Sequence, residues 1–169
     1  MRFEVDASGD ISQKLQGLAK RYPKIGIRAV GVAGARLWQD IVHEEPRPHI
    51  LTGYTRNSIS LHVGGKLANA PERGPITSTY AGRTTTSGQA SVPSSVNESG
   101  MTAVVAVNSP YAAILHELPP GKLGPRSASD GGVGPKFVES KLIKNQDRYV
   151  KIFAEHFARG LEEASKERE

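Results

Sequence analysis

The sequence contains no cysteine and no long apolar run. Without thiols the chain can form neither disulfides nor thiolate metal sites, a composition that suits a reducing compartment. No stretch approaches the roughly 20 apolar residues that span a bilayer. The N-terminal letters MRFEVDASGD have neither the basic region nor the apolar region of a secretory leader. We therefore expect a soluble protein that is made in the cytoplasm and has no membrane partner.

The short motifs of common enzymes are also lacking. GxSxG, SxxK, the P-loop and GxGxxG are absent, although the chain has 18 glycines. The stretch HEEPRPH contains two histidines, but its prolines exclude the helical spacing that places two imidazoles on one face. His116 and Glu117 are adjacent, so on a helix their side chains are expected to diverge by about 100°. We expect no catalytic residue, no metal site and no cofactor.

Long runs of like charge are scarce as well, because the 22 basic residues are interspersed with 17 acidic ones. The exception is a basic cluster of four residues that could face DNA. These are Lys20, Arg21, Lys24 and Arg28. Such side chains can contact phosphates, but no aromatic residue is interleaved with them in the manner of a single-strand binding surface. A solvated face is the favoured interpretation, and nucleic-acid binding is kept as an alternative.

The chain length of 169 residues fits one domain, 1–169, with a real core. The letters RFEVD predict a first strand, and apolar residues from Ile11 to Tyr22 predict a short helix that Pro23 interrupts. A second helix is predicted from Lys24 to about Glu45. Gly26, Gly31 and Gly34 weaken it, which indicates either positions where another backbone comes near or a frayed helix.

Two strands are predicted further on. In RNSISLHV, Ile59, Leu61 and Val63 alternate with the polar Ser58, Ser60 and His62, as in a half-buried antiparallel strand. GMTAVVAVN has the β-branched density of a second strand, and its small alanines indicate that both of its faces are covered.

Residues 64–100 lie between these two strands. In this segment 20 of 37 residues are Gly, Pro, Ser or Thr, so it cannot form a core. We interpret it as an extended loop or arm, either disordered or lying along a partner by strand addition.

The last part of the chain predicts two more helices. Pro110 begins a short one, in which Tyr111, Ile114 and Leu115 are expected to pack inward and His116 to lie at the surface or an interface. After Pro135, apolar residues recur at helical spacing to about residue 165. The predicted fold class is α+β, with a small antiparallel sheet flanked by long N-terminal and C-terminal helices and a long loop between two strands.

Three short stretches occur in a defined order, and together they carry a resemblance. They are LTGYTRNSI at 51–59, YAAILHE at 111–117 and GPKFVESKL at 134–142. The set is similar to the tail-completion or neck proteins of long-tailed bacteriophages, which read P-x-x-TG-x-L-R-x-SI, YA-x-x-x-E-x-G and RPF-x-x-P-A in this order. The resemblance covers most of the chain outside 64–100 and 118–134. Among the departures, Lys136 stands directly before Phe137, where the family has proline.

The resemblance implies a non-enzymatic subunit of a homo-oligomeric ring, expected to be a hexamer, in the virion tail or neck. Its implied partners are a tail-tube or tail-terminator protein and a head-closure or connector protein, with DNA passing through the lumen without sequence-specific binding. It would be synthesised in the host cytoplasm. The alternatives are a tail terminator or other minor tail protein, and a small nucleic-acid-binding protein.

The same motifs supply the residues expected to have interface or structural roles. These are Thr52, Gly53, Arg56, Tyr111, Glu117 and Phe137. Thr52 and Gly53 suit a tight turn, and the guanidinium of Arg56 can bind a carboxylate or a carbonyl. Arg56 is therefore the candidate partner of Glu117, in the same subunit or the next one.

Overall fold

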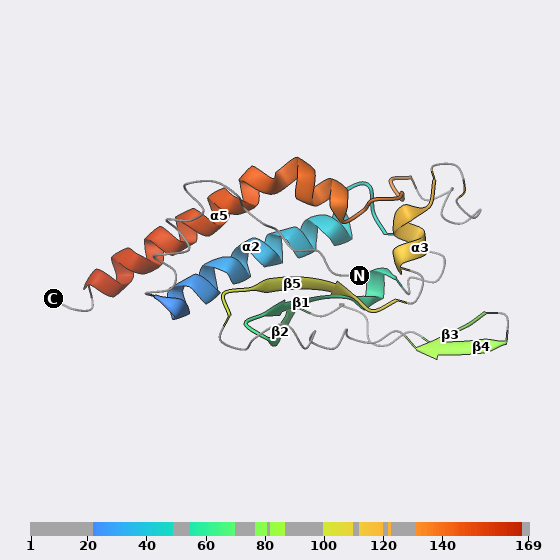
Figure 1. Cartoon of the computed structure of the whole chain (residues 1–169), viewed down its shortest axis with the longest axis horizontal. Helices are drawn as coiled ribbons and strands as arrows, with labels where there is room; N and C mark the ends of the chain where they lie inside the picture. The colour runs from blue at the N-terminus through green and yellow to red at the C-terminus, as the bar shows by residue number, and fades with distance from the viewer. Residues whose placement is uncertain are drawn as a thin grey trace.

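A computed structural model describes most of the chain and has the expected α+β architecture (Figure 1). The described residues are 22–48, 55–69, 77–80, 82–86, 100–109, 112–119, 122 and 131–166. The predicted first strand and the helix from Ile11 lie outside them. The helices are α2 (Pro23–His43), η1 (Arg56–Ser58, a 3-10 turn), α3 (Ala112–Glu117) and α5 (Glu139–Lys166). The strands are β1 (Ile59–Val63), β2 (Lys66–Asn69), β3 (Thr77–Tyr80), β4 (Arg83–Thr86) and β5 (Ala103–Val107).

The two long helices and the sheet form layers. Figure 1 shows α2 between α5 and the strands β1 and β5, and both helices run across the same side of the sheet. Pro23 stands in the first turn of α2, where a missing N–H costs nothing. The helix ends at His43, and Glu44 is already extended as the chain approaches Pro46. Both long helices therefore lie close to their predicted bounds.

The main sheet has the order β2-β1-β5 and is antiparallel throughout. The register of β1 and β5 runs from Ile59↔Val107 to Val63↔Ala103. The two predicted strands are thus confirmed, and they pair with each other directly. β2 follows β1 through Gly64 and Gly65, whose φ angles of 55° and 75° fit the two-residue turn that suits the twist of a hairpin.

Residues 64–100 were expected to be an extended segment without regular structure, and that expectation is partly wrong. β2 lies in this segment and forms one edge of the main sheet. β3 and β4 form a separate two-stranded sheet, which we call the ribbon. Threonine explains it, because β-branched residues favour strands and two threonine pairs bond across the ribbon, Thr77 with Thr86 at 3.1 Å and Thr79 with Thr84 at 2.9 Å.

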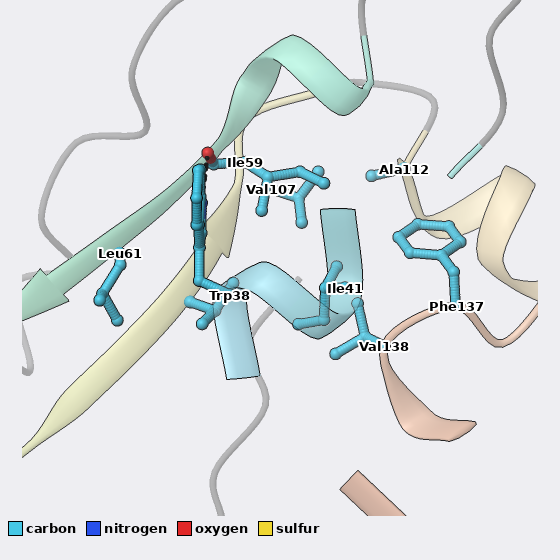
Figure 2. Packing of buried hydrophobic residues seen from close by; sticks show 9 residues of the cluster. Trp38, Ile41, Ile59, Leu61, Val107, Ala112, Phe137 and Val138 are labelled. Atoms are coloured by element: carbon cyan, nitrogen blue, oxygen red, sulfur yellow. Dashed lines mark hydrogen bonds between the residues drawn. The ribbon is translucent and has the colours of Figure 1, made fainter. Parts of the chain in front are cut away.

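The buried core lies where α2, β1, β5, α3 and the start of α5 meet (Figure 2). Trp38 belongs to this core, and its indole N–H donates to the carbonyl of Ile59 at 3.0 Å. Pairing of β2 with β1 stops at Leu61↔Asn69, so this carbonyl lies beyond the reach of β2. Trp38 supplies a donor to a buried acceptor and joins α2 to the first residue of β1.

The polar face of β1 is not exposed, which corrects the prediction of a half-buried strand. Ser58, Ser60 and His62 are all buried. Burial of these groups is tolerated because they bond internally: the Ser60 hydroxyl lies 3.1 Å from His62 Nε2, and the Ser58 hydroxyl donates to the carbonyl of Thr55 at 2.8 Å. Ala106, opposite Ser60, is buried too, in agreement with the prediction that both faces of the second strand are covered.

Two of the α2 glycines mark close contacts with the sheet, as one interpretation of the sequence predicts. A Cβ on Gly34 would lie 2.7 Å from the Cβ of Ala103 and 3.1 Å from a methyl of Leu61. A Cβ on Gly31 would lie 3.3 Å from a methyl of Val63. On α5, a Cβ on Gly160 would lie 2.5 Å from a methyl of Ile25. The absence of side chains at Gly34 and Gly160 lets α2 approach both the sheet and α5.

Replacing Gly34 with Ala should destabilise the protein by about 1–2 kcal/mol, because overpacking outweighs the gain in helix propensity. Gly31→Ala is the matched control: its neighbour is one movable methyl of the half-buried Val63, so its free energy of unfolding should change little. Urea denaturation of the three proteins measures the difference. A Gly34→Ala variant as stable as Gly31→Ala would contradict the close approach.

Candidate functional site

Four side chains meet where α3 ends and α5 begins, and we call them the α3–α5 cluster: His116, Glu117, Lys136 and Glu139. Nδ1 of His116 lies 2.9 Å from one carboxylate oxygen of Glu117. The ammonium of Lys136 lies 2.6 Å from the other oxygen and 2.9 Å from the carboxylate of Glu139. Residues more than twenty positions apart thus share one network of charge-assisted hydrogen bonds.

The main chain ties the same two helices together. The N–H of Lys136 donates to the carbonyl of His116 at 2.8 Å. The N–H of Glu139, the first residue of α5, donates to Nε2 of His116 at 3.4 Å. Because Nε2 accepts, the ring proton lies on Nδ1 and is donated to Glu117. His116 therefore accepts from the first N–H of α5, while the next N–H groups donate to the carbonyls of Lys136 and Val138.

The interior of the cluster is apolar. His116 is only 1% exposed, and its ring meets that of Phe137 edge to face, with 5.0 Å between the ring centres. Lys136 has a φ of 54°, a left-handed conformation that is uncommon outside glycine. Phe137 itself is fully buried in the core while the preceding Lys136 stays half exposed beside the two glutamates.

The electrostatics of the cluster are mutually supportive. The Lys136 ammonium lowers the pKa of Glu117, and the hydrogen bond from His116 lowers it further. Glu117 and then Glu139 raise the pKa of Lys136. Each charged form is thus stabilised by its neighbour, which favours a fixed ion network rather than a group prepared to exchange protons near neutral pH.

The cluster has the elements of a metal site, yet its donors are already engaged. Ligand atoms of His116, Glu117 and Glu139 all lie within 4.8 Å of one another, so the expectation that adjacent His116 and Glu117 diverge is wrong at this helix end. The Lys136 ammonium, however, bridges both carboxylates, and Nδ1 of His116 carries a proton. A metal ion would have to displace both, so the arrangement suits a structural lock.

The structure revises several roles expected from the motifs. The cation that meets Glu117 is Lys136 of the same chain, rather than Arg56, which begins η1 and is half-buried. Phe137 lies in the buried core. Thr52, Gly53 and Tyr111 lie outside the described residues. Lys136 is one of the residues by which the chain departs from the tail-protein pattern, so the motifs do not predict this pair.

The orientation of α3 is also corrected. Ile114, expected to pack inward, is 64% exposed, whereas Ala112 and His116 are buried. These two residues are one helical turn apart and face the core together. His116 replaces an apolar residue there because its two ring nitrogens are hydrogen-bonded.

The basic cluster proposed to face DNA is only partly described. Lys20 and Arg21 lie outside the described residues, and Lys24 is exposed at the start of α2. Arg28 is exposed as well and lies 3.8 Å from the carboxylate of Glu163 on α5. An acidic neighbour reduces the positive potential at this end of the helix pair, which weakens the nucleic-acid alternative.

A second polar cluster joins α2 to α5, and the sequence did not single it out. Asp40, 1% exposed, accepts a hydrogen bond from the Tyr149 hydroxyl at 2.8 Å and pairs with Arg36 at 2.8 Å. Burial raises the pKa of Asp40, while the Tyr149 hydrogen bond opposes the shift. Burial also raises the pKa of Tyr149, so the phenol keeps its proton and remains a donor.

Lys141 makes a further buried link from α5 to the segment after α2. Its ammonium donates to the carbonyl of Pro46 at 3.1 Å, and burial lowers its pKa. Together with Asp40 and Tyr149, this contact holds the first turns of α5 against the end of α2.

No model of a known protein family, no curated protein and no solved structure matches the chain. Within the described residues, no helix is both long and apolar enough to cross a membrane.

Replacing Glu117 with Gln should lower the melting temperature at neutral pH, because Lys136 and His116 lose an anionic partner. The pKa of Glu117 is lowered in the folded state, so its stabilisation is present above its ordinary pKa of 4.5 and is lost as the pH falls through the lowered value. The difference in melting temperature between Glu117→Gln and wild type should therefore vanish in strong acid. Thermal unfolding monitored by circular dichroism from acid to neutral pH measures it. A difference independent of pH would contradict the ion network.

Replacing Tyr149 with Phe should cost about 1.5–3 kcal/mol, because a buried carboxylate loses a donor. Asn145→Ala is the control, since its amide lies 3.4 Å from the same hydroxyl and does not reach Asp40. Urea unfolding should show a clearly smaller loss for the control. Equal losses would mean that the arginines beside Asp40, Arg36 and Arg148, suffice without the Tyr149 hydrogen bond.

Proposed function

We propose that the chain is a non-enzymatic virion subunit of the tail-completion or neck type, which forms a ring between the tail tube and the head-proximal connector. One observation carries the proposal. Ile59, Ala112 and Phe137, one from each of the three motif stretches, belong to the same buried cluster (Figure 2). Stretches that are far apart in the sequence thus form one structural unit, as expected if they specify a shared fold.

The roles of the polar residues support a structural function. The histidine and carboxylates that come closest to a chemical site join α3 to α5, and Asp40 and Tyr149 join α2 to α5. In each cluster the hydrogen-bonding groups fix the position of a helix.

The ribbon supports a role in assembly. It projects beyond the end of the main sheet, away from α2 and α5 (Figure 1), and its described side chains are exposed. A two-stranded hairpin is marginally stable on its own in water, so a partner that covers it would stabilise it. Such a segment suits a subunit that reaches an adjacent subunit or ring.

The proposed partners follow from this role. They are further copies of the chain in a ring, proposed to be a hexamer, a tail-tube or tail-terminator protein on one side and a head-closure or connector protein on the other. DNA would pass through the lumen without sequence-specific contacts. A tail terminator or another minor tail protein is the second candidate, since it would use the same fold in a neighbouring ring.

Particles assembled without this chain should contain filled heads and separate tails, because the joint between them would be missing. Electron microscopy of lysates measures the fraction of joined particles. Supplying the wild-type chain in trans should restore joining. A variant lacking residues 70–98 should fold but restore it poorly. Normal joining in the complete absence of the chain would contradict the neck role.

A further inference from the structure

Within the part of the chain that the structure describes, two β elements have edges without a partner strand, and they lie in different sheets. β2 is an outer strand of the main sheet, and Lys66, Leu67 and Ala68 are exposed. The other outer strand, β5, differs in that the side chains from Val104 to Val107 are all buried. Within the described residues only β1 pairs with β2. An open edge strand presents unpaired N–H and C=O groups, which can bind a further strand.

Hairpin geometry identifies which main-chain groups of β2 point outward. Val63 and Lys66 flank the two-residue turn, so they form a hydrogen-bonded pair. The next pair, His62↔Leu67, is then a non-hydrogen-bonded one, and the N–H and C=O of Leu67 point away from β1. The Leu67 side chain is 42% exposed, although leucine is usually buried.

The same reasoning applies to the ribbon. Tyr80 and Arg83 flank its two-residue turn, so Thr79↔Thr84 and Thr77↔Thr86 are non-hydrogen-bonded pairs. Side chains approach most closely in such pairs, in agreement with the threonine hydrogen bonds across the ribbon. The N–H and C=O groups of Thr77 and Thr79 therefore point outward along the β3 edge. Both threonines are exposed.

We propose that the β3 edge of one copy pairs with the β2 edge of a second copy, and so extends the main sheet across the subunit boundary. The partner is a second copy because the described residues of each chain carry both kinds of edge, that of β2 in the main sheet and those of the ribbon. Of the two ribbon edges we choose β3, since β4 carries Arg83. β3 has no charged residue and β2 has a single lysine, so no like-charge repulsion opposes the pairing. This contact rests on the proposed function, because it names the surface by which copies would join in the ring. Self-association of the purified chain is measured independently of that function.

The two edges are different surfaces, so the contact is heterologous. Repeated from copy to copy, it gives a closed ring when the rotation closes and an open chain when it does not. Each copy then donates one ribbon and accepts one.

Proline substitutions test the pairing, because proline removes one N–H and is tolerated on an edge strand where that N–H points to solvent. Leu67→Pro should disable the acceptor edge and Thr79→Pro the donor edge. Neither change removes a main-chain hydrogen bond to β1 or β4. Thr79→Pro does remove the side-chain hydrogen bond to Thr84 of β4, and its control Thr79→Val removes the same bond. Leu67→Val and Thr79→Val are matched controls that keep the N–H. Sedimentation velocity over a range of protein concentrations should show self-association of the wild type and both controls, weakened about tenfold or more in each proline variant. Circular dichroism should show that all variants fold.

Mixing the two proline variants is the decisive measurement. Leu67→Pro keeps a working ribbon and Thr79→Pro keeps a working β2 edge, so the mixture should form a 1:1 dimer and nothing larger. A wild type that stays monomeric, proline variants that associate like their controls, or a mixture without the dimer would each overturn the proposal. If Thr79→Pro unfolds, Thr77→Pro replaces it, and if Leu67→Pro unfolds, Leu67→Asp replaces it, because a charge on an edge strand opposes pairing. The mixture is then judged by the same criterion. If chains that fail this test still join heads to tails normally, only the proposed strand contact is overturned. The proposed neck function is then unaffected.

Discussion

The close packing of α2 on both of its sides is the constraint on which the rest of the structure depends. Gly34 brings one side of the helix against Ala103 and Leu61 of the sheet, and Ile25 fills the space left by Gly160 of α5 on another side. A helix covered in this way can carry few charges on its faces, and the one carboxylate that is fully buried, Asp40, is bonded to Arg36 and Tyr149. Trp38 then fixes the helix along the sheet through the carbonyl of Ile59. Position and register are thus set by a few specific contacts within a larger apolar interface.

The sequence predicts the helices and strands in which apolar residues recur at regular spacing. α2, β1, β5 and α5 follow from apolar spacing, and the glycines of α2 indicate its close approach to another backbone. β2 and the ribbon were missed because Gly, Ser and Thr dominate their segment and hide short strands. The Gly64-Gly65 pair was the available signal for the first hairpin, since both residues adopt positive φ. The threonines of β3 and β4 were the signal for the second, because a run of β-branched residues on either side of Gly82 favours two short strands.

The candidate site was less predictable because its geometry depends on tertiary contacts. The Tyr111 to Glu117 motif drew attention to Glu117, but nothing local indicates that Lys136 would be its partner or that His116 would turn inward. His116 is buried because α5 offers it a donor, the N–H of Glu139, and Glu117 offers it an acceptor. Apolar spacing assigns Ile114 to the core instead, since it takes no account of polar residues that satisfy each other in the interior. The burial of Asp40 was not predicted for the same reason, although its i,i+4 spacing from Arg36 indicates an ion pair.

A rigid body and an exposed polar ribbon suit a subunit whose stability and assembly are separate tasks. The α3–α5 cluster and the Asp40 network lie within the body and fix its helices against each other. The ribbon and the β2 edge lie outside that core. Within the described residues β2 lacks a partner strand along one edge, and the ribbon lacks one along both. Pairing between main-chain groups depends little on side-chain identity, so an edge contact tolerates a neutral, low-complexity sequence such as 64–100. The composition that prevents this segment from building a core is therefore compatible with a specific contact, provided that the contact is made by the backbone.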